Sequence, residues 1–250
     1  MGKRRRRHRS ERAEFGGMTI GALIAAAVAI VAILVFALVN MPREVQADPQ
    51  RMPRTDFSFG EDDAPPQRIA FLGDSWAGGA GSDAAGAENS YAGKAGRALG
   101  AEYAIFPGGG TGYTAGNPTT GEGPFITRVQ PLIEFAPDVV VVQGSSNDYR
   151  ATGEQIAAAA REVLTTIRAA LPEATIYVVG VVDSPASPAD RMQISREAVA
   201  AAAAEVGATW IDANAEGWLD VNVDFADGFH PNEQGHQKVA DRLVALLAGT

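Results

Sequence analysis

The hydrophobic positions of this chain fall into two patterns that change near residue 67. Residues 18–39, MTIGALIAAAVAIVAILVFALV, are almost wholly apolar, and no charged side chain lies between Phe15 and Pro42. A helix of this length spans about 33 Å, which is enough to cross a hydrocarbon core of about 30 Å. The pattern therefore predicts a transmembrane helix over residues 18–39.

Beyond residue 67, short apolar runs predict buried strands. The clearest is DVVVVQG at 138–144, where four consecutive valines are typical of a strand that helices cover on both faces. The other predicted strands are residues 68–73, 101–106, 175–182 and 208–212.

Longer stretches with helical periodicity separate these runs. The predicted helices are residues 91–99, a helix opened by the capping-box pair Thr152 and Gln155, residues 190–206 and residues 232–247. Alternating strands and helices predict an α/β domain over residues 67–250, in which a parallel sheet has helices on both faces.

Charge gives the apolar segment a direction. The net charge is −9, but residues 1–17 carry seven basic and two acidic side chains, or +5, which leaves −14 for the remainder. Basic residues mark the cytoplasmic flank of a membrane span, so everything after residue 40 is expected outside the cytoplasm. A signal peptide cleaved after Ala47 is the alternative, although its apolar core would be longer than the usual 7–15 residues. Residues 40–66 hold five prolines and predict an extended tether.

Composition excludes several classes of function. An acidic main body disfavours binding to nucleic acid through its phosphates. The chain has no cysteine, so it contains no disulfide, thiolate nucleophile or cysteine-bound metal. We expect neither a cofactor nor a metal site.

Candidate chemistry lies at the ends of the predicted strands, where α/β proteins bind their ligands. GDSW places Ser75 after the first strand, and PGGGTGYT, residues 107–114, follows the second. GSSND, residues 144–148, follows the third, and DFADGFHPNEQGH, residues 224–236, leads into the last helix. Together they supply a hydroxyl, an imidazole, carboxylates and amide donors. This is the set needed to activate a serine and to stabilise an oxyanion.

These four fragments, in this order, resemble the SGNH/GDSL hydrolases. The resemblance covers about residues 67–250 and implies a flavodoxin-like three-layer α/β/α fold. It also implies an esterase, lipase or carbohydrate deacetylase that needs no metal. Carried over residue by residue, it makes Ser75 the nucleophile, His230 the base and Asp227 the acid that orients it. The oxyanion donors would be the backbone N–H groups of Ser75 and Gly109 and the side-chain amide of Asn147.

Three positions depart from the family pattern. Trp76 stands where a leucine usually follows the serine, and Pro107 stands where the second block usually has asparagine. This leaves the oxyanion glycine open among residues 108–110. Ser145 occupies the usual glycine position of the third block, so the loop there is expected to differ.

Two alternative interpretations of the same residues are less consistent with the sequence. Asp224 also precedes His230, but only Asp227 is close enough in sequence for a compact turn to bring its carboxylate to the ring. GTGYTA, residues 110–115, fits a dinucleotide fingerprint that requires a helix to begin there, and the following GNPTTGEGP excludes one.

The remaining candidates are expected to be structural. Asp74 and Asp148 are expected to make turn and loop hydrogen bonds, and His236 to be a polar residue in the first turns of the last helix. The aromatic residues near the motifs are expected to pack rather than to bind a sugar; they are Trp76, Tyr91, Tyr113 and Phe229.

The sequence thus predicts a membrane-anchored, extracytoplasmic serine esterase that removes an acyl group, such as acetyl, from a cell-envelope glycan or glycolipid. A lipase or thioesterase acting on longer acyl chains is an alternative. A non-catalytic surface binding module is another.

Overall fold

The computed structural model describes residues 66–248, which belong to one compact unit, Glu61–Thr250. Its sheet has five parallel strands in the order β2-β1-β3-β4-β5. The strands are β1 (Arg68–Gly73), β2 (Glu102–Pro107), β3 (Val139–Gln143), β4 (Thr175–Val179) and β5 (Thr209–Ile211). This is the flavodoxin-like order that the resemblance implied.

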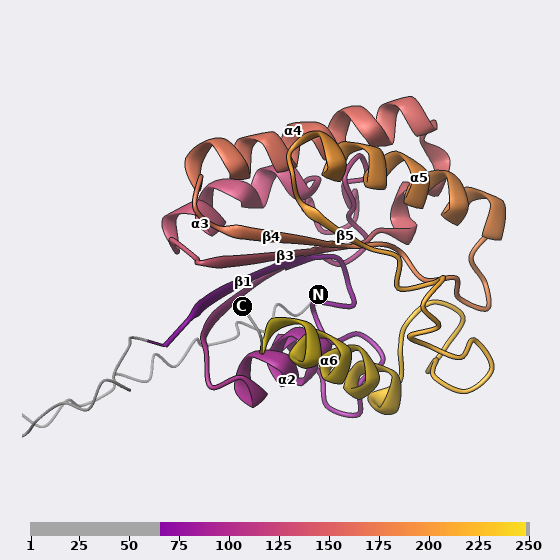
Figure 1. The fold of residues 1–250 in the computed structure, drawn as a ribbon. Coiled ribbons are helices and arrows are strands. Elements are labelled where there is room, and N and C mark those ends of the chain that lie inside the picture. Colours follow the sequence, from indigo (N-terminus) through magenta and orange to yellow (C-terminus); the bar gives the residue numbers. More distant parts are fainter. Residues whose placement is uncertain (1–65, 249–250) are drawn as a thin grey trace, which may run out of the picture. The chain divides into compact units, whose positions relative to one another are not determined.

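Helices cover both faces of the sheet (Figure 1). One face carries α2 (Tyr91–Ala98) and α6 (Glu233–Leu247); the other carries α3 (Val129–Glu134), α4 (Gly153–Ala170) and α5 (Ala189–Glu205). Successive side chains of a strand point to opposite faces. In β1, Ile69 and Phe71 therefore join the apolar cluster under α2 and α6, whereas Ala70 and Leu72 join the opposite one. The predicted three-layer fold is confirmed.

Polar side chains fix where three helices begin. Ser90 caps α2 by accepting hydrogen bonds from two backbone N–H groups, and Asn232 caps α6 by accepting the backbone N–H of Gly235. Thr152 and Gln155 form the predicted capping box of α4. These caps satisfy N–H groups that have no partner within their own helix.

Two regions differ from the sequence-based expectation. The predicted strand 175–182 ends at Val179, because both neighbouring strands end there: Val179 pairs with Gln143, the last residue of β3, and with Ile211, the last residue of β5. Helix α3 was not predicted, and neither were three short 3₁₀ helices: η1 (Ala87–Asn89), η2 (Phe125–Arg128) and η3 (Ser146–Arg150). They lie in segments that are too short or too rich in turn residues to show a period.

The predicted transmembrane helix, residues 18–39, lies outside the described residues, as does nearly all of the tether. Across 66–248, none of the helices combines the length and the apolar character that a membrane span requires.

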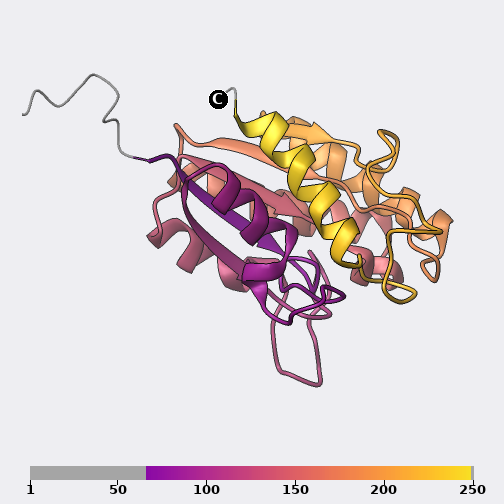
Figure 2. The same cartoon turned by 90° about the horizontal axis from the view of Figure 1, so that it is seen from below.

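The segments that follow β1, β2 and β3 leave the sheet at its carboxyl edge. The segments after β1 and β2 project from the body next to each other, as the view from below shows (Figure 2). The loop that leads into α6 reaches the same edge through a contact between His230 and Ser75. All four predicted motifs therefore lie at one edge of the sheet.

Candidate active site

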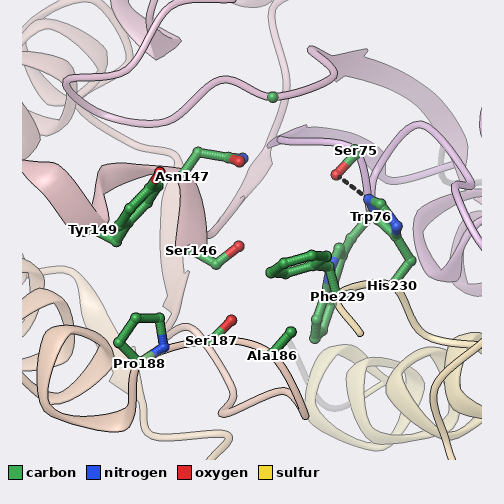
Figure 3. A pocket seen from close by; sticks show the side chains of 11 residues that line it. Ser75, Trp76, Ser146, Asn147, Tyr149, Ala186, Ser187, Pro188, Phe229 and His230 are labelled. Carbon is green, nitrogen blue, oxygen red and sulfur yellow. Dashed lines mark hydrogen bonds between the residues drawn. The ribbon is translucent and has the colours of Figure 1, made fainter. Parts of the chain in front are cut away.

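A chain of hydrogen bonds links the serine, the histidine and an acid. His230 Nε2 lies 3.1 Å from Ser75 Oγ, and His230 Nδ1 lies 2.9 Å from Asp227 Oδ2 (Figure 3 shows the contact with Ser75). The other Asp227 oxygen accepts the backbone N–H groups of Phe229 and His230, at 2.7 and 2.8 Å. These two bonds close a tight turn that holds the carboxylate against the ring.

The environment of Asp227 favours its ionised form. Burial raises its pKa, but the hydrogen bonds from His230 and from the two backbone N–H groups outweigh burial, so the pKa of Asp227 is lowered. An ionised Asp227 keeps the proton of the imidazole on Nδ1, which leaves Nε2 free to accept the serine proton.

Asp224, the other acid before His230, lies elsewhere. Its side chain is fully buried and binds Lys238 Nζ of α6 through both oxygens, each at 2.7 Å. It also accepts the backbone N–H of Asp220. The expectation that Asp227, not Asp224, reaches His230 agrees with this geometry.

Ser75 follows β1 in a loop that folds back on itself. The backbone N–H of Ala80 donates to Ser75 O at 3.0 Å, and that of Trp76 donates to Asp74 Oδ1 at 2.9 Å. Asp74 is fully buried, and burial raises its pKa to about 6. Asp74 therefore makes the turn contact that the sequence predicted, as a carboxyl group that is easily protonated.

Trp76 connects this loop to the histidine. Its indole N–H donates to the backbone oxygen of Phe229 at 3.0 Å, and its ring meets Phe225 edge-on. Trp76, which stands at the position where the family usually has leucine, thus donates a hydrogen bond to the residue that precedes His230. The sequence offered no signal for this contact.

Several backbone N–H groups at and near Ser75 are open, which means that they donate no hydrogen bond to a described residue. Among the described residues, those of Ser75, Gly109 and Gly110 have no protein acceptor, whereas that of Gly108 donates to Gly73 O. The choice among the three glycines therefore narrows to Gly109 and Gly110. The Asn147 side chain also lines the cavity at Ser75, but its amide donates to Thr111 O at 2.9 Å and to Ser145 Oγ at 3.1 Å.

Thr111, which sequence reasoning missed, ties these donors together. Its hydroxyl donates to Gly108 O at 2.8 Å, which fixes the peptide that carries the Gly109 N–H. Its carbonyl accepts both the Asn147 amide and the Ser145 hydroxyl, and Arg128 donates to its hydroxyl at 2.9 Å. The only feature of the sequence that could have pointed to Thr111 was its place within a run of glycines.

In the dinucleotide-like segment 110–115, three backbone N–H groups are bound by a side chain of the protein itself. The Asp148 carboxylate accepts the backbone N–H groups of Tyr113, Thr114 and Ala115 and the Thr114 hydroxyl, at 2.6–3.0 Å. No helix begins in this segment. Asp148 is a loop anchor, as predicted.

The remaining candidates are structural. His236 is fully buried, where Nδ1 accepts the Tyr91 N–H and Nε2 donates to Ala80 O. Burial lowers the pKa of His236, which keeps it neutral. Tyr91 and Tyr113 are buried packing residues, whereas Trp76 and Phe229 face a cavity. Within 66–248, no group of three or more His, Cys, Asp or Glu side chains could hold a metal ion.

Two cavities flank Ser75. The larger, about 480 Å³, is lined by His230, Asn147 and Gly110 together with aromatic, small apolar and hydroxyl side chains. Figure 3 shows Tyr149 and Phe229 on opposite sides of it, with Ala186 and Pro188 also contributing. The smaller, about 300 Å³, is lined by glycines, alanines, Pro107 and Glu122. Ser75 alone lines both.

Comparison with known proteins identifies the family. Residues 71–238, most of the described chain, match the GDSL-like Lipase/Acylhydrolase family. The chain belongs to this family. The sequence-based expectation of a GDSL-type ester hydrolase is thereby confirmed at the level of the family.

Other members and structures are similar to parts of this GDSL-family chain. A GDSL lipase of Mycobacterium tuberculosis is 30% identical over 115 residues, which are 44% of this chain and 50% of that protein. The chain thus spans about half the length of this relative.

Solved structures share the fold at low identity. A family two carbohydrate esterase of Clostridium thermocellum, solved with cellohexaose, has a TM-score of 0.61 and 20% identity over 74% of this chain and 65% of its own. An aryl esterase of M. smegmatis has a TM-score of 0.59 and 17% identity over 74% and 99%.

Proposed function

We propose that this chain is a serine esterase in which Ser75 is the nucleophile, His230 the general base and Asp227 the acid that orients the imidazole. The observation that carries the proposal is the continuous chain of contacts from Ser75 Oγ to His230 Nε2 and from His230 Nδ1 to Asp227. A serine hydroxyl becomes an effective nucleophile when a neighbouring base takes its proton.

The reaction proceeds in two steps, acylation of Ser75 and hydrolysis of the acyl-enzyme. Ser75 Oγ attacks the ester carbonyl carbon while its proton passes to His230 Nε2. The bond to the alcohol oxygen then breaks, and His230 returns the proton to the leaving alcohol. Water next attacks the acyl-enzyme, again through His230, which releases the carboxylic acid and restores the Ser75 hydroxyl.

The oxyanion that forms in each step needs donors that are already in place. The open N–H groups of Ser75 and Gly109 supply two of them. Asn147 supplies a third by exchanging its longer contact, 3.1 Å to Ser145 Oγ, for the oxyanion.

As the substrate we propose an acylated glycan or glycolipid of the cell envelope, with acetyl as the acyl group. The predicted export of residues 67–250 motivates the location. The carbohydrate esterase of Clostridium thermocellum, which shares the fold, and the hydroxyl and aromatic side chains around the larger cavity support a sugar ester.

A lipase or thioesterase acting on longer acyl chains is a second candidate. It is favoured by the volume of the larger cavity, about 480 Å³, and by its apolar wall, which exceed what an acetyl group requires.

Covalent labelling of the full chain tests the proposal. A fluorophosphonate probe should modify Ser75 stoichiometrically, and Ser75→Ala should abolish labelling. Ser146→Ala removes a hydroxyl from the same cavity but not the one bonded to His230, so this control should still be labelled. A chain that resists the probe and hydrolyses no ester would instead be the non-catalytic binding module.

A panel of esters separates the two substrate candidates. p-Nitrophenyl esters of rising chain length and acetylated sugars should be hydrolysed with the highest kcat/KM at acetyl. A maximum at eight or more carbons would favour the lipase.

A further inference from the structure

We propose that the smaller cavity beside Ser75 is the binding site for the alcohol half of the ester, and that it favours a hydroxylated or cationic alcohol over an anionic one. This inference rests on the proposed esterase function. It assigns a ligand to a cavity that the triad itself does not explain.

An ester has two halves that diverge from the carbonyl carbon attacked by Ser75. The two cavities meet at Ser75, which is the one residue that lines both. Each half of a bound ester therefore has a cavity of its own.

The linings differ in chemistry. The larger cavity has Trp76, Tyr149 and Phe229 in its wall, so burying an acyl chain there removes apolar surface from water. The smaller cavity is lined by small residues such as Gly79 and Ala80, with one charged side chain, Glu122. Small side chains leave backbone groups within reach, and a carboxylate accepts hydrogen bonds from hydroxyl or ammonium groups.

Glu122 is held in place for this role. It lies in a short hairpin whose backbone is paired by bonds from Asn117 N to Glu122 O and from Gly121 N to Asn117 O. The Thr120 hydroxyl donates to its carboxylate at 3.0 Å. Arg128 interacts with Glu122 electrostatically, but its guanidinium donates hydrogen bonds to the Thr111 hydroxyl and to Gly123 O. The Glu122 carboxylate therefore forms no direct ion pair with Arg128.

The histidine can serve an alcohol held in the smaller cavity. The loop that forms one wall continues into Gly81, which packs on His230: a Cβ atom at Gly81 would lie 2.9 Å from His230 Cβ. His230 Nε2 lies 3.1 Å from Ser75 Oγ, the point where the two cavities meet. The His230 ring itself lines only the larger cavity, so Nε2 can pass its proton to the departing oxygen where that oxygen lies beside Ser75.

Charge at Glu122 is tested with two acetate esters of the same shape. Acetylcholine carries a cation in its alcohol half, and 3,3-dimethylbutyl acetate is its neutral isostere. With the full chain, Glu122→Gln should lower the ratio of kcat/KM for acetylcholine to kcat/KM for 3,3-dimethylbutyl acetate by about threefold, as expected for an exposed carboxylate. Glu173→Gln, an equal charge change just before β4 and thus at the opposite edge of the sheet, should leave the ratio unchanged.

The size of the alcohol that the smaller cavity accepts is tested by narrowing this cavity at its rim. Ala85 is exposed and lines this cavity, so Ala85→Phe should narrow it without disturbing the core. Its kcat/KM for an acetylated monosaccharide should fall at least about tenfold relative to methyl acetate, because a bulky alcohol no longer fits. Its profile over methyl esters from acetate to octanoate should match that of the unaltered protein.

Phe229→Ala provides the reciprocal test, and should change the acyl-length profile but not the ratio of the two acetate isosteres. The reverse pattern, in which Ala85→Phe alters the acyl profile and Phe229→Ala alters the alcohol preference, would overturn the assignment while leaving the esterase intact. An unchanged isostere ratio in Glu122→Gln would also contradict it. A protein that hydrolyses none of these esters and is not labelled at Ser75 would instead overturn the proposed function, and the assignment with it.

Discussion

At the scale of single residues, the site depends on contacts that bring together segments far apart in the sequence. Trp76 is the clearest case, because its indole N–H binds the backbone oxygen of Phe229, next to His230. Trp76→Phe keeps an aromatic ring but removes this donor. We expect kcat to fall severalfold, in line with a loss of about 1 kcal/mol for one hydrogen bond, with little change in KM. Steady-state kinetics on a short acetate ester would measure this, and equal kcat values would show that the contact does not position His230.

Thr111 offers a second residue-scale prediction. Its hydroxyl orients the peptide that carries the Gly109 N–H. Thr111→Val removes the hydroxyl at similar size, so kcat should fall by about tenfold with KM nearly constant, the signature of lost transition-state stabilisation. Thr111→Ser keeps the hydroxyl and should restore most of kcat. If both variants lose activity equally, or if KM rises instead, Thr111 is a packing residue only.

At the scale of the elements, the loop between β5 and α6 holds two acids that have different partners. Asp224 ties this loop to Lys238 of α6, whereas Asp227 contacts His230. Asp227→Asn should lose most activity, up to about 10⁴-fold as in well-studied triads, with the melting temperature nearly unchanged. Asp224→Asn should lower the melting temperature because it weakens a buried ion pair, while retaining far more activity. Similar losses of kcat in both variants would remove Asp227 from its proposed role.

Elements with a strong local pattern were the ones the sequence predicted. The valines of β3 and the capping box of α4 lie within one residue of where they were expected, because burial on both faces and local capping leave a signal in nearby residues. The predicted end of β4 was wrong because it depends on where the partner strands β3 and β5 end, at Gln143 and Ile211, which are far from Val179 in the sequence. Helix α3 is only six residues long and contains Pro131, so it has little period to detect.

In the candidate site too, the residues that stand in a local sequence pattern were predicted, and those that depend on long-range contacts were not. Ser75, Asp227 and His230 stand in recognisable motifs, and the structure brings them together. Thr111 and the cavity beside Glu122 depend on how the loop after β2 folds around Asp148 and Asn117. Such contacts join residues through space and have no fixed spacing in the sequence.

At the scale of the whole molecule, stability should depend on pH through Asp74. Burial raises the pKa of Asp74 from 3.8 to about 6. Between these values the carboxyl is ionised in the unfolded chain but protonated in the fold, so the free energy of unfolding should decrease as pH rises through this window. The decrease attributable to Asp74 is about 3 kcal/mol.

Comparison with Asp74→Asn tests this group, because the substitution removes its carboxyl and leaves every other titratable side chain in the protein. Urea unfolding at pH 4, 5, 6 and 7 should show the stability of the unaltered protein relative to the variant falling up to about pH 6 and then levelling off. Parallel curves for the two proteins would mean that Asp74 ionises normally in the fold.

The order of segments along the chain predicts a topology for the whole protein. If residues 18–39 anchor it with a cytoplasmic N-terminus, protease added to intact cells should remove residues 67–250 and spare the basic segment. A domain protected from protease would contradict this orientation. A soluble form that begins at Asp48 would identify the cleaved signal peptide instead.

Ser75 and His230 lie 155 residues apart along the chain, which sets the order in which the two side chains become available during synthesis. All five strands are complete by Ile211, so the sheet has its full set of partners before the histidine leaves the ribosome. His230 arrives just before α6, which packs against α2 near the start of the domain. If His230 is the base that activates Ser75, a nascent chain that stops before residue 230 has the serine in place but not the group that would activate it.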